Sequence, residues 1–288
     1  MFFRFFCLVF LTTSVFANSV SFDDFLDQVR KSAIEQGVSK STIDQAFSGL
    51  TAPDPSIITE DGAQAEFSQN FWHYFNKRIS KTRINNGNDT LKQNASLLNK
   101  TSQQYGVPSR VIVAFLGLES NYGNFMGNES LVQSLATLAY DPRRSKFFTR
   151  ELIAALKLMD KKTIPINATG SWAGAIGAVQ FMPTNVLAYG IDANNDGKVN
   201  LWNDKEDIYA SAGNFLKILG WKKGEKWGRE ALIPKNFDYR LTGLNNEKTV
   251  NEWAALGVLR GNGSALPRSN FKASLIVPMG YKGPAFLV

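Results

Sequence analysis

The stretch VIVAFLGLESNYG, residues 111–123, decides how the rest of this chain is organised. Its first eight residues carry only apolar side chains and one glycine, which predicts a helix buried on most of its circumference. Glu119 closes this run, and burial there is expected to raise its pKa and keep a general acid protonated near neutral pH. Asn121 and Gly123 then end the helix, so we expect Glu119 at a helix terminus facing a cleft. The alternative is a last-turn glutamate that simply reaches solvent.

The N-terminus predicts export. Residues 1–17 carry one early cation, Arg4, then an apolar block and a terminal Val15-Phe16-Ala17, which is typical of a cleaved signal peptide. The apolar block is too short to span a membrane comfortably. Cys7 is the only cysteine, so no disulfide is expected. Removing the signal takes away Arg4 and no acid, so the net charge of +7 becomes +6. A basic exported protein suits an anionic extracellular polymer, although the excess lysine also serves solubility.

The remaining residues, 18–288, predict one catalytic region that is mainly helical with minor β structure. Helical periodicity is present at 22–37, 41–47, 67–79, 91–105, 131–140, 147–159 and 208–220. Asn86-Gly87-Asn88 is expected to break the chain between two of these helices. From Trp221 onward, short apolar pieces broken by glycine, asparagine and proline predict small strands and loops. His73 is the only histidine, which makes a zinc site improbable.

Residues 192–207 resemble a calcium-binding loop. Asp192, Asn194 and Asp196 occupy its first, third and fifth positions, and Gly197 the sixth. The twelfth position is Asn203 instead of glutamate, so a closing carboxylate is expected just beyond it, from Glu206 or Asp207. The alternative is an Asx-rich turn that binds no metal.

A glycine-rich segment, GAIGAVQFMP at residues 174–183, is the third notable pattern. Glycines at this density either bring backbone amides to a ligand or let two elements pack closely. A nucleotide-binding loop is rejected, because no predicted strand precedes the segment and no ribose-binding acid follows it at the expected distance. A glycine-lined wall with an amide side chain and aromatics suits a sugar polymer instead.

Five segments together carry a family resemblance. They occur in the order YGVPSRVIVAFLGLESNYG, RRSKFFTREL, GSWAGAIGAVQFMPTN, DANNDGKVNLWN and LGW. From about Phe22 to the C-terminus the chain resembles the lytic murein transglycosylase B family. The resemblance implies a lysozyme-like core, a periplasmic location, and cleavage of the bond between N-acetylmuramic acid and N-acetylglucosamine in peptidoglycan, with no cofactor for the chemistry.

The same resemblance assigns roles to individual residues. It makes Glu119 the catalytic acid and base, has Ser171 and Gln180 hold the substrate, and places Tyr122 as an aromatic beside the cleft. Phe181 and Tyr189 are expected to contact the substrate as well. It also implies a structural calcium ion bound by Asp192, Asn194, Asp196, the backbone of Lys198 and, allowing for an insertion, Asp207.

The acids around Glu119 favour an unusual mechanism. Ordinary glycosidases flank the scissile bond with two carboxylates. Here no partner acid stands out, since Glu129 and Asp141 lie in turns with no evident relation to Glu119. One carboxyl suffices if the muramic C6 hydroxyl is the nucleophile and closes a 1,6-anhydro ring. A water-using muramidase and a calcium-stabilised wall-binding protein without catalysis remain alternatives.

The expected partners follow from the same features. Glycan strands are the expected partner of a monomeric protein, and dispersed basic residues argue against nucleic acid. The family usually continues beyond the position of Val288 with a stretch rich in Tyr and Asn, which this chain is expected to lack. An apolar tail there would be exposed unless it is paired in a sheet.

Overall fold

The computed structural model describes residues 20–62, 70–224 and 226–288. The predicted signal peptide and Cys7 lie outside these residues, and so do the first positions of the helix predicted at 67–79. No helix in the described ranges has both the length and the apolar character needed to cross a membrane. The described chain is mainly helical with short strands, which confirms the predicted fold class.

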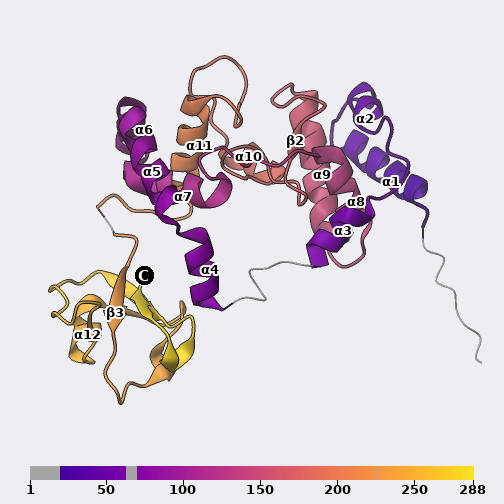
Figure 1. The fold of residues 1–288 in the computed structure, drawn as a ribbon. Coiled ribbons are helices and arrows are strands. Elements are labelled where there is room, and N and C mark those ends of the chain that lie inside the picture. Colours follow the sequence, from indigo (N-terminus) through magenta and orange to yellow (C-terminus); the bar gives the residue numbers. More distant parts are fainter. Residues whose placement is uncertain (1–19, 63–69, 225) are drawn as a thin grey trace, which may run out of the picture.

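The helices form one lobe and most of the strands form another (Figure 1). The helices of the first lobe are α1 (Phe22–Glu35), α2 (Lys40–Ala46), α3 (Pro55–Gly62), α4 (Phe71–Arg78), α5 (Lys81–Gln93), α6 (Ala95–Tyr105), α7 (Ser109–Ser120), α8 (Leu131–Tyr140), α9 (Ser145–Asp160), α10 (Pro183–Tyr189) and α11 (Lys205–Ile218). Two short strands, β1 (Glu129–Ser130) and β2 (Thr169–Gly170), pair antiparallel within it.

Helices α8 and α9 pack against each other at the centre of one half of the helical lobe. Helices α1, α2 and α10 pack on α9, while α3 packs on α8. Helices α5, α6, α7 and α11 form the other half, and α10 and β2 lie between the halves (Figure 1). A single apolar cluster joins both halves, because α7, α8, α9 and α11 all contribute buried side chains to it. The helix that carries Glu119 therefore rests on the main core.

The second lobe is an antiparallel sheet with its own core. Its strands are β3 (Arg229–Leu232), β4 (Glu247–Thr249), β5 (Leu259–Arg260), β6 (Lys272–Ile276) and β7 (Ala285–Leu287), in the order β4-β6-β7-β3-β5. Helix α12 (Val250–Ala255) brings Trp253 into this core, where its indole Nε1 donates to Ala273 O at 2.8 Å. Two short 3₁₀ helices, Tyr239–Leu241 and Gly280–Lys282, complete the lobe.

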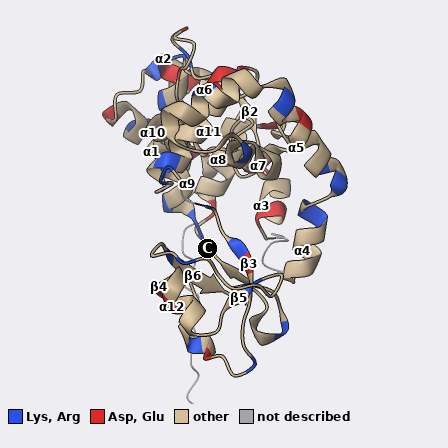
Figure 2. Cartoon of the chain, turned by 90° about the vertical axis from the view of Figure 1, so that its left-hand side faces the viewer, with Lys and Arg blue, Asp and Glu red and all other residues tan. Residues whose placement is uncertain are grey.

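The last apolar residues of the chain form a strand that is paired in the sheet, so they are not left as an unpaired apolar tail. Strand β7 pairs with both β3 and β6, and Leu287 is buried. Helix α4 lies between the lobes, where the Phe71 ring meets Phe286 with centroids 5.7 Å apart (Figure 1). Lys and Arg are spread over both lobes instead of gathering in one patch (Figure 2).

The expected break at Asn86-Gly87-Asn88 is wrong, because α5 runs through it without interruption. Gly87 is needed for packing instead: a Cβ there would lie 2.6 Å from the Tyr122 hydroxyl. Helices α3 and α10 were not expected either. Both begin at a proline, which the first turn of a helix tolerates because the missing N–H has no intrahelical partner there.

Candidate active site

Glu119 lies in the last turn of α7, as its sequence predicts. Ser120 beside it is buried, and its hydroxyl donates to Ala178 O at 2.6 Å and accepts from Gly123 N at 2.9 Å. Asn121, Tyr122 and Gly123 all have positive φ angles, so the chain leaves the helix in three successive left-handed residues. The end of α7 is therefore tied to the glycine-rich segment by hydrogen bonds and cannot rotate freely.

The environment of Glu119 favours its protonated form. Its side chain reaches the surface, yet the surrounding protein displaces enough water to raise its pKa, and only partial compensation comes from the Arg78 guanidinium. The carboxyl makes no hydrogen bond or ion pair with any residue that the structure describes, so it is available to a ligand. Within that same part of the chain, no carboxylate contributes to its pKa.

The two acids considered as partners for Glu119 have other surroundings. Glu129 is exposed in β1. Asp141 pairs with Arg143 at 2.8 Å, and hydrogen bonds from Arg143 hold the pKa of Asp141 below its usual value. Within the described residues, neither acid makes a hydrogen bond with Glu119.

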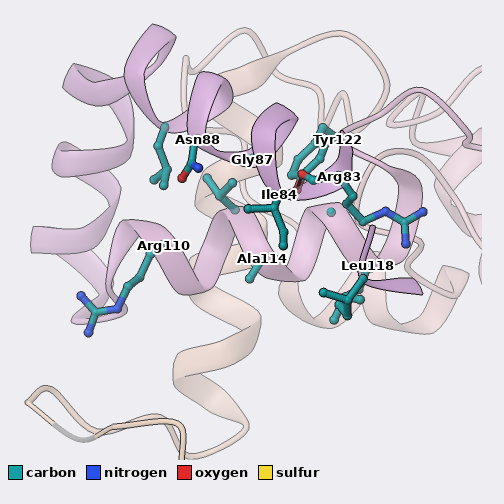
Figure 3. Close-up of a pocket in the computed structure, with 12 residues that line it drawn as sticks. Arg83, Ile84, Gly87, Asn88, Arg110, Ala114, Leu118 and Tyr122 are labelled. Atoms are coloured by element: carbon teal, nitrogen blue, oxygen red, sulfur yellow. Dashed lines mark hydrogen bonds between the residues drawn. The ribbon is translucent and has the colours of Figure 1, made fainter. Parts of the chain in front are cut away.

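The helix around Glu119 is less buried than expected. Ala114 and Leu118 lie on an open face of α7, where they line a pocket of about 270 Å³ between α5 and α7 (Figure 3). The pocket is mostly apolar, and Arg83 and Arg110 stand at its ends (Figure 3). Glu119 is not among the residues that line it. Its predicted cleft thus stays a prediction.

Tyr122 is half-buried between α5 and α7. Its ring lies against Gly87 and Gly117, where an added Cβ would come within 2.7 Å of the tyrosine, and its hydroxyl donates to Arg83 O at 2.7 Å. Burial raises the pKa of this hydroxyl. The geometry therefore makes Tyr122 a link between α5 and α7, in a position to hold the Glu119 helix.

The glycine-rich segment lies shortly after β2, and the glycines in β2 and in the segment serve close packing. A Cβ on Gly170 would lie 2.3 Å from Ala175 O, one on Gly174 2.3 Å from the Leu135 side chain, and one on Gly177 2.4 Å from Leu201 O. Of the two roles open from the sequence, close approach of elements is the one that these contacts support.

Ser171 and Gln180 begin and end the turns of this segment. The Ser171 hydroxyl accepts from Ala175 N at 3.0 Å, and the side chain is half-buried. Gln180 has a φ of +49°, and its Nε2 donates to Met126 O at 3.2 Å and to Gly177 O at 3.0 Å. With both amide hydrogens used, the Oε1 atom of Gln180 remains as an acceptor for a ligand.

The expectation that Phe181 contacts substrate is corrected by its burial. Its side chain is 2% exposed, with its ring against Phe215 at a centroid distance of 4.9 Å. Tyr189 is half-buried and packs on the other side of the same phenylalanine at 5.3 Å.

Several residues near the site were missed from the sequence. Arg78 at the end of α4 is the cation that acts on Glu119, and its guanidinium lies 5.4 Å from the Tyr74 ring centre. Trp72, Tyr74 and Phe75 of the same helix are exposed. The only available signal was the density of aromatics in FWHYFNKR, which does not reveal what the helix faces.

In the 192–207 loop, side-chain oxygens accept hydrogen bonds from nearby backbone amides. Asp192 accepts from the amides of Asp196 and Gly197, and Asp196 accepts from the amide of Lys198 at 2.9 Å. Asn194 Oδ1 accepts from Asp196 N at 2.9 Å. These bonds hold the side-chain oxygens of alternate residues around one turn. Among the described residues, no group of three or more His, Cys, Asp or Glu could by itself hold a metal, so amide and main-chain oxygens would have to contribute.

Two acids close the loop in different ways. Asp207 is buried, and its two oxygens accept from Ala193 N and Asn200 N, each at 2.8 Å. Burial raises the pKa of Asp207, and the carboxylates of Asp204 and Asp192 add to that rise. Asp204, which was not predicted, accepts from Asn194 Nδ2 at 2.7 Å. Its other oxygen accepts from Glu206 N and Asp207 N, so Asp204 also caps α11.

Comparison with known proteins places these features in a family. A family model described as transglycosylase SLT domain matches residues 21–288. Membrane-bound lytic murein transglycosylase B of Escherichia coli is 33% identical over 222 residues, 73% of this chain. The chain spans only 60% of that relative's length.

Two solved structures are similar along most of the chain. SltB3 from Pseudomonas aeruginosa, in complex with NAG-NAM-pentapeptide, has a TM-score of 0.88 and 41% identity over 93% of this chain and 72% of its own. The Escherichia coli lytic transglycosylase SLT35, in complex with calcium, has a TM-score of 0.74 and 29% identity over 91% of this chain and 82% of its own. The lysozyme-like fold class implied by the family resemblance is confirmed by these matches.

Proposed function

The chain belongs to the transglycosylase SLT-domain family, and from this membership we propose that it is a peptidoglycan lytic transglycosylase. The proposed reaction cleaves the β-1,4 bond between N-acetylmuramic acid and N-acetylglucosamine and leaves a 1,6-anhydromuramic acid end. The observation that carries the proposal is Glu119, a carboxyl with a raised pKa and no partner among the described residues, on the rigid end of α7.

Glu119 performs both proton transfers in the proposed mechanism. Its protonated carboxyl donates to the glycosidic oxygen, so the bond from that oxygen to the muramic C1 breaks with a neutral leaving hydroxyl. The resulting carboxylate then takes the proton of the muramic C6 hydroxyl while the C6 oxygen bonds to C1. This second transfer restores the protonated Glu119. No water enters the product.

The substrate is proposed to lie between the end of α7 and the glycine-rich segment. The Gln180 Oε1 accepts from an N-acetyl N–H, and the Ser171 hydroxyl donates to a sugar or acetyl oxygen. Tyr122, Phe181 and Tyr189 act behind this surface by holding its elements in place. A glycan in the cell wall as substrate implies action outside the cytoplasm.

A calcium ion is proposed to stiffen the 192–207 loop. Asp192, Asn194, Asp196 and the main-chain oxygen of Lys198 would hold it, since hard cations prefer such oxygens at alternate positions. The closing carboxylate would come from Asp207, whose oxygens accept from Ala193 N and Asn200 N, or from Asp204, which accepts from Asn194 Nδ2 and caps α11. Calcium should then raise the unfolding temperature of the wild-type protein and of a Lys161→Asn control, but not of Asp192→Asn. An equal rise in Asp192→Asn would refute this site.

The enzymatic proposal is tested with Glu119→Gln and a matched control, Glu129→Gln. Purified wild type should release soluble fragments with anhydromuramic ends from sacculi, identified by mass spectrometry. Glu119→Gln should release none while keeping its fold, whereas Glu129→Gln should match wild type. Reducing muramic ends would indicate hydrolysis, and full activity of Glu119→Gln would end the assignment.

A further inference from the structure

A second concave surface lies on the helical lobe, separate from Glu119. It is a cavity of about 840 Å³ between helix α2, the segment joining α9 to β2, and the end of the 192–207 loop. In Figure 1 the segment joining α9 to β2 and the one joining α10 to α11 both rise at the edge of the lobe away from the sheet lobe. The residues that line the cavity do not include Glu119, Arg78 or Ser171, but they do include Met126, whose carbonyl accepts from Gln180 at 3.2 Å, so the cavity adjoins the proposed substrate surface.

Some of the polar side chains that line this cavity make no hydrogen bond within the described protein. The side chains of Asn167, Thr169, Asn203 and Gln45 line it, and none of them makes a side-chain hydrogen bond with a described residue. The Trp202 indole is half-buried in the same wall, and its Nε1 has no hydrogen-bond partner in the described ranges. Unused amides and hydroxyls around an aromatic face are what sites for sugars and peptides present.

The charge of the cavity favours an anionic ligand. Lys162 and Lys198 line it, and neither forms an ion pair with a residue that the structure describes. The acid in the lining is Asp160, whose carboxylate accepts from the hydroxyls of Ser39 and Thr42; these bonds lower its pKa. Asp160 is held by α2 and keeps its negative charge, so the lining carries two ammonium groups against one carboxylate.

The walls of this cavity are held by specific bonds. Lys162 has a φ of +58°, which fixes a tight turn after α9. On the facing wall, Leu201 O accepts from Ala178 N at 2.7 Å, and Asn200 N donates to Asp207 at 2.8 Å. The surface is therefore a built site between two anchored segments, and its volume falls in the range of small-molecule sites.

We infer that this cavity is a second peptidoglycan-binding site, which takes a peptide-bearing amino-sugar unit of the wall through the carboxylates of its stem peptide. The inference rests on the proposed function, which supplies the substrate class. The lysines would bind the carboxylates, Trp202 would cover a sugar ring or methyl face, and the amides would bind peptide or N-acetyl groups. Such a site would keep the enzyme on the wall while Glu119 acts on another unit.

The test uses Lys162→Asn, because asparagine tolerates the left-handed backbone, with Lys161→Asn as the matched control. Lys161 is the preceding residue, carries the same charge and does not line the cavity. Each is combined with Glu119→Gln to prevent turnover. Calorimetric titration with a GlcNAc–MurNAc-peptide should show two sites in the Lys161→Asn protein, with the second weakened up to about fivefold by Lys162→Asn, as expected for one exposed ion pair.

Further arms separate this inference from the proposed function. Chitotetraose, which has no carboxylate, should bind equally to both variants. With Glu119 intact, Lys162→Asn should retain the wild-type kcat on a short soluble glycan but show a raised KM on sacculi. Equal behaviour of the two lysine variants in every arm would overturn the second site. If the wild-type protein shows no activity on these substrates, the proposed function is overturned instead.

Discussion

The contact between Gly87 and Tyr122 leads to a prediction in which one substitution changes sign with its background. Gly87→Ala on an isolated helix would stabilise it by about 1 kcal/mol. In this protein the new Cβ would lie 2.6 Å from the Tyr122 hydroxyl, and 3.3 Å and 3.6 Å from two ring carbons. Relieving the contact requires the hydroxyl to move away, although its 2.7 Å bond to Arg83 O holds it.

The two effects oppose each other and differ in size. Overpacking of this kind costs about 1–3 kcal/mol, so Gly87→Ala should lower the free energy of unfolding by up to about 2 kcal/mol in wild type. In the Tyr122→Phe background the closest atom is removed and the nearest contact becomes 3.3 Å. There the helix preference prevails, and Gly87→Ala should be neutral or stabilising by up to about 1 kcal/mol.

Urea unfolding followed by far-UV circular dichroism measures this double-mutant cycle, since both residues lie in the helical lobe. Gly62→Ala is the control, because Gly62 is also helical but has no atom within 4 Å of its added Cβ. Equal losses from Gly87→Ala in both backgrounds would refute the reasoning. So would stabilisation of wild type by Gly87→Ala, since glycine would then serve no packing purpose.

Three further results are expected. Because burial raises the pKa of Glu119 in the folded protein, its ionisation opposes folding; stability present in acid is lost as the pH rises through the raised pKa. Enzymatic activity should fall as the pH rises through the same range. Glu119→Gln should raise the unfolding temperature at neutral pH but not in acid. Activity that does not change with pH would contradict this reasoning. Asp207→Asn should lower the free energy of unfolding in urea by about 1–3 kcal/mol even without calcium, because one backbone amide loses its acceptor. A loss of stability seen only when calcium is present would exclude this role. Glu151 is 1% exposed and accepts from Thr184 N and Oγ1, each at 2.9 Å. Glu151→Ala should lower the free energy of unfolding by about 2–3 kcal/mol and, by displacing α10, raise KM. Thr184→Val is the control, and unchanged stability in both variants would show that this pair is not needed.

The sequence by itself determined the helix that carries Glu119 and the way that helix ends. A run of apolar residues up to Leu118 favours a helix with a buried face, although Ala114 and Leu118 lie on an open one, and Asn121 and Gly123 are residue types that accept left-handed backbone. It also determined the helical class of the chain, the strands after Trp221 and the alternating oxygens of the 192–207 loop. These features depend on residues close in sequence, so local patterns are sufficient to predict them.

Only the tertiary structure decided what the individual side chains face. By residue type alone Gly87 disfavours a helix, but the ring of Tyr122, distant in sequence, makes it a packing residue within a helix. An aromatic residue such as Phe181 is of a type that can contact a sugar, yet its packing against the ring of Phe215 places it in the core. The influence of Arg78 on Glu119 likewise depends on how two helices meet. Contacts of this kind are set by the packing of whole elements, and no spacing along the chain encodes them directly.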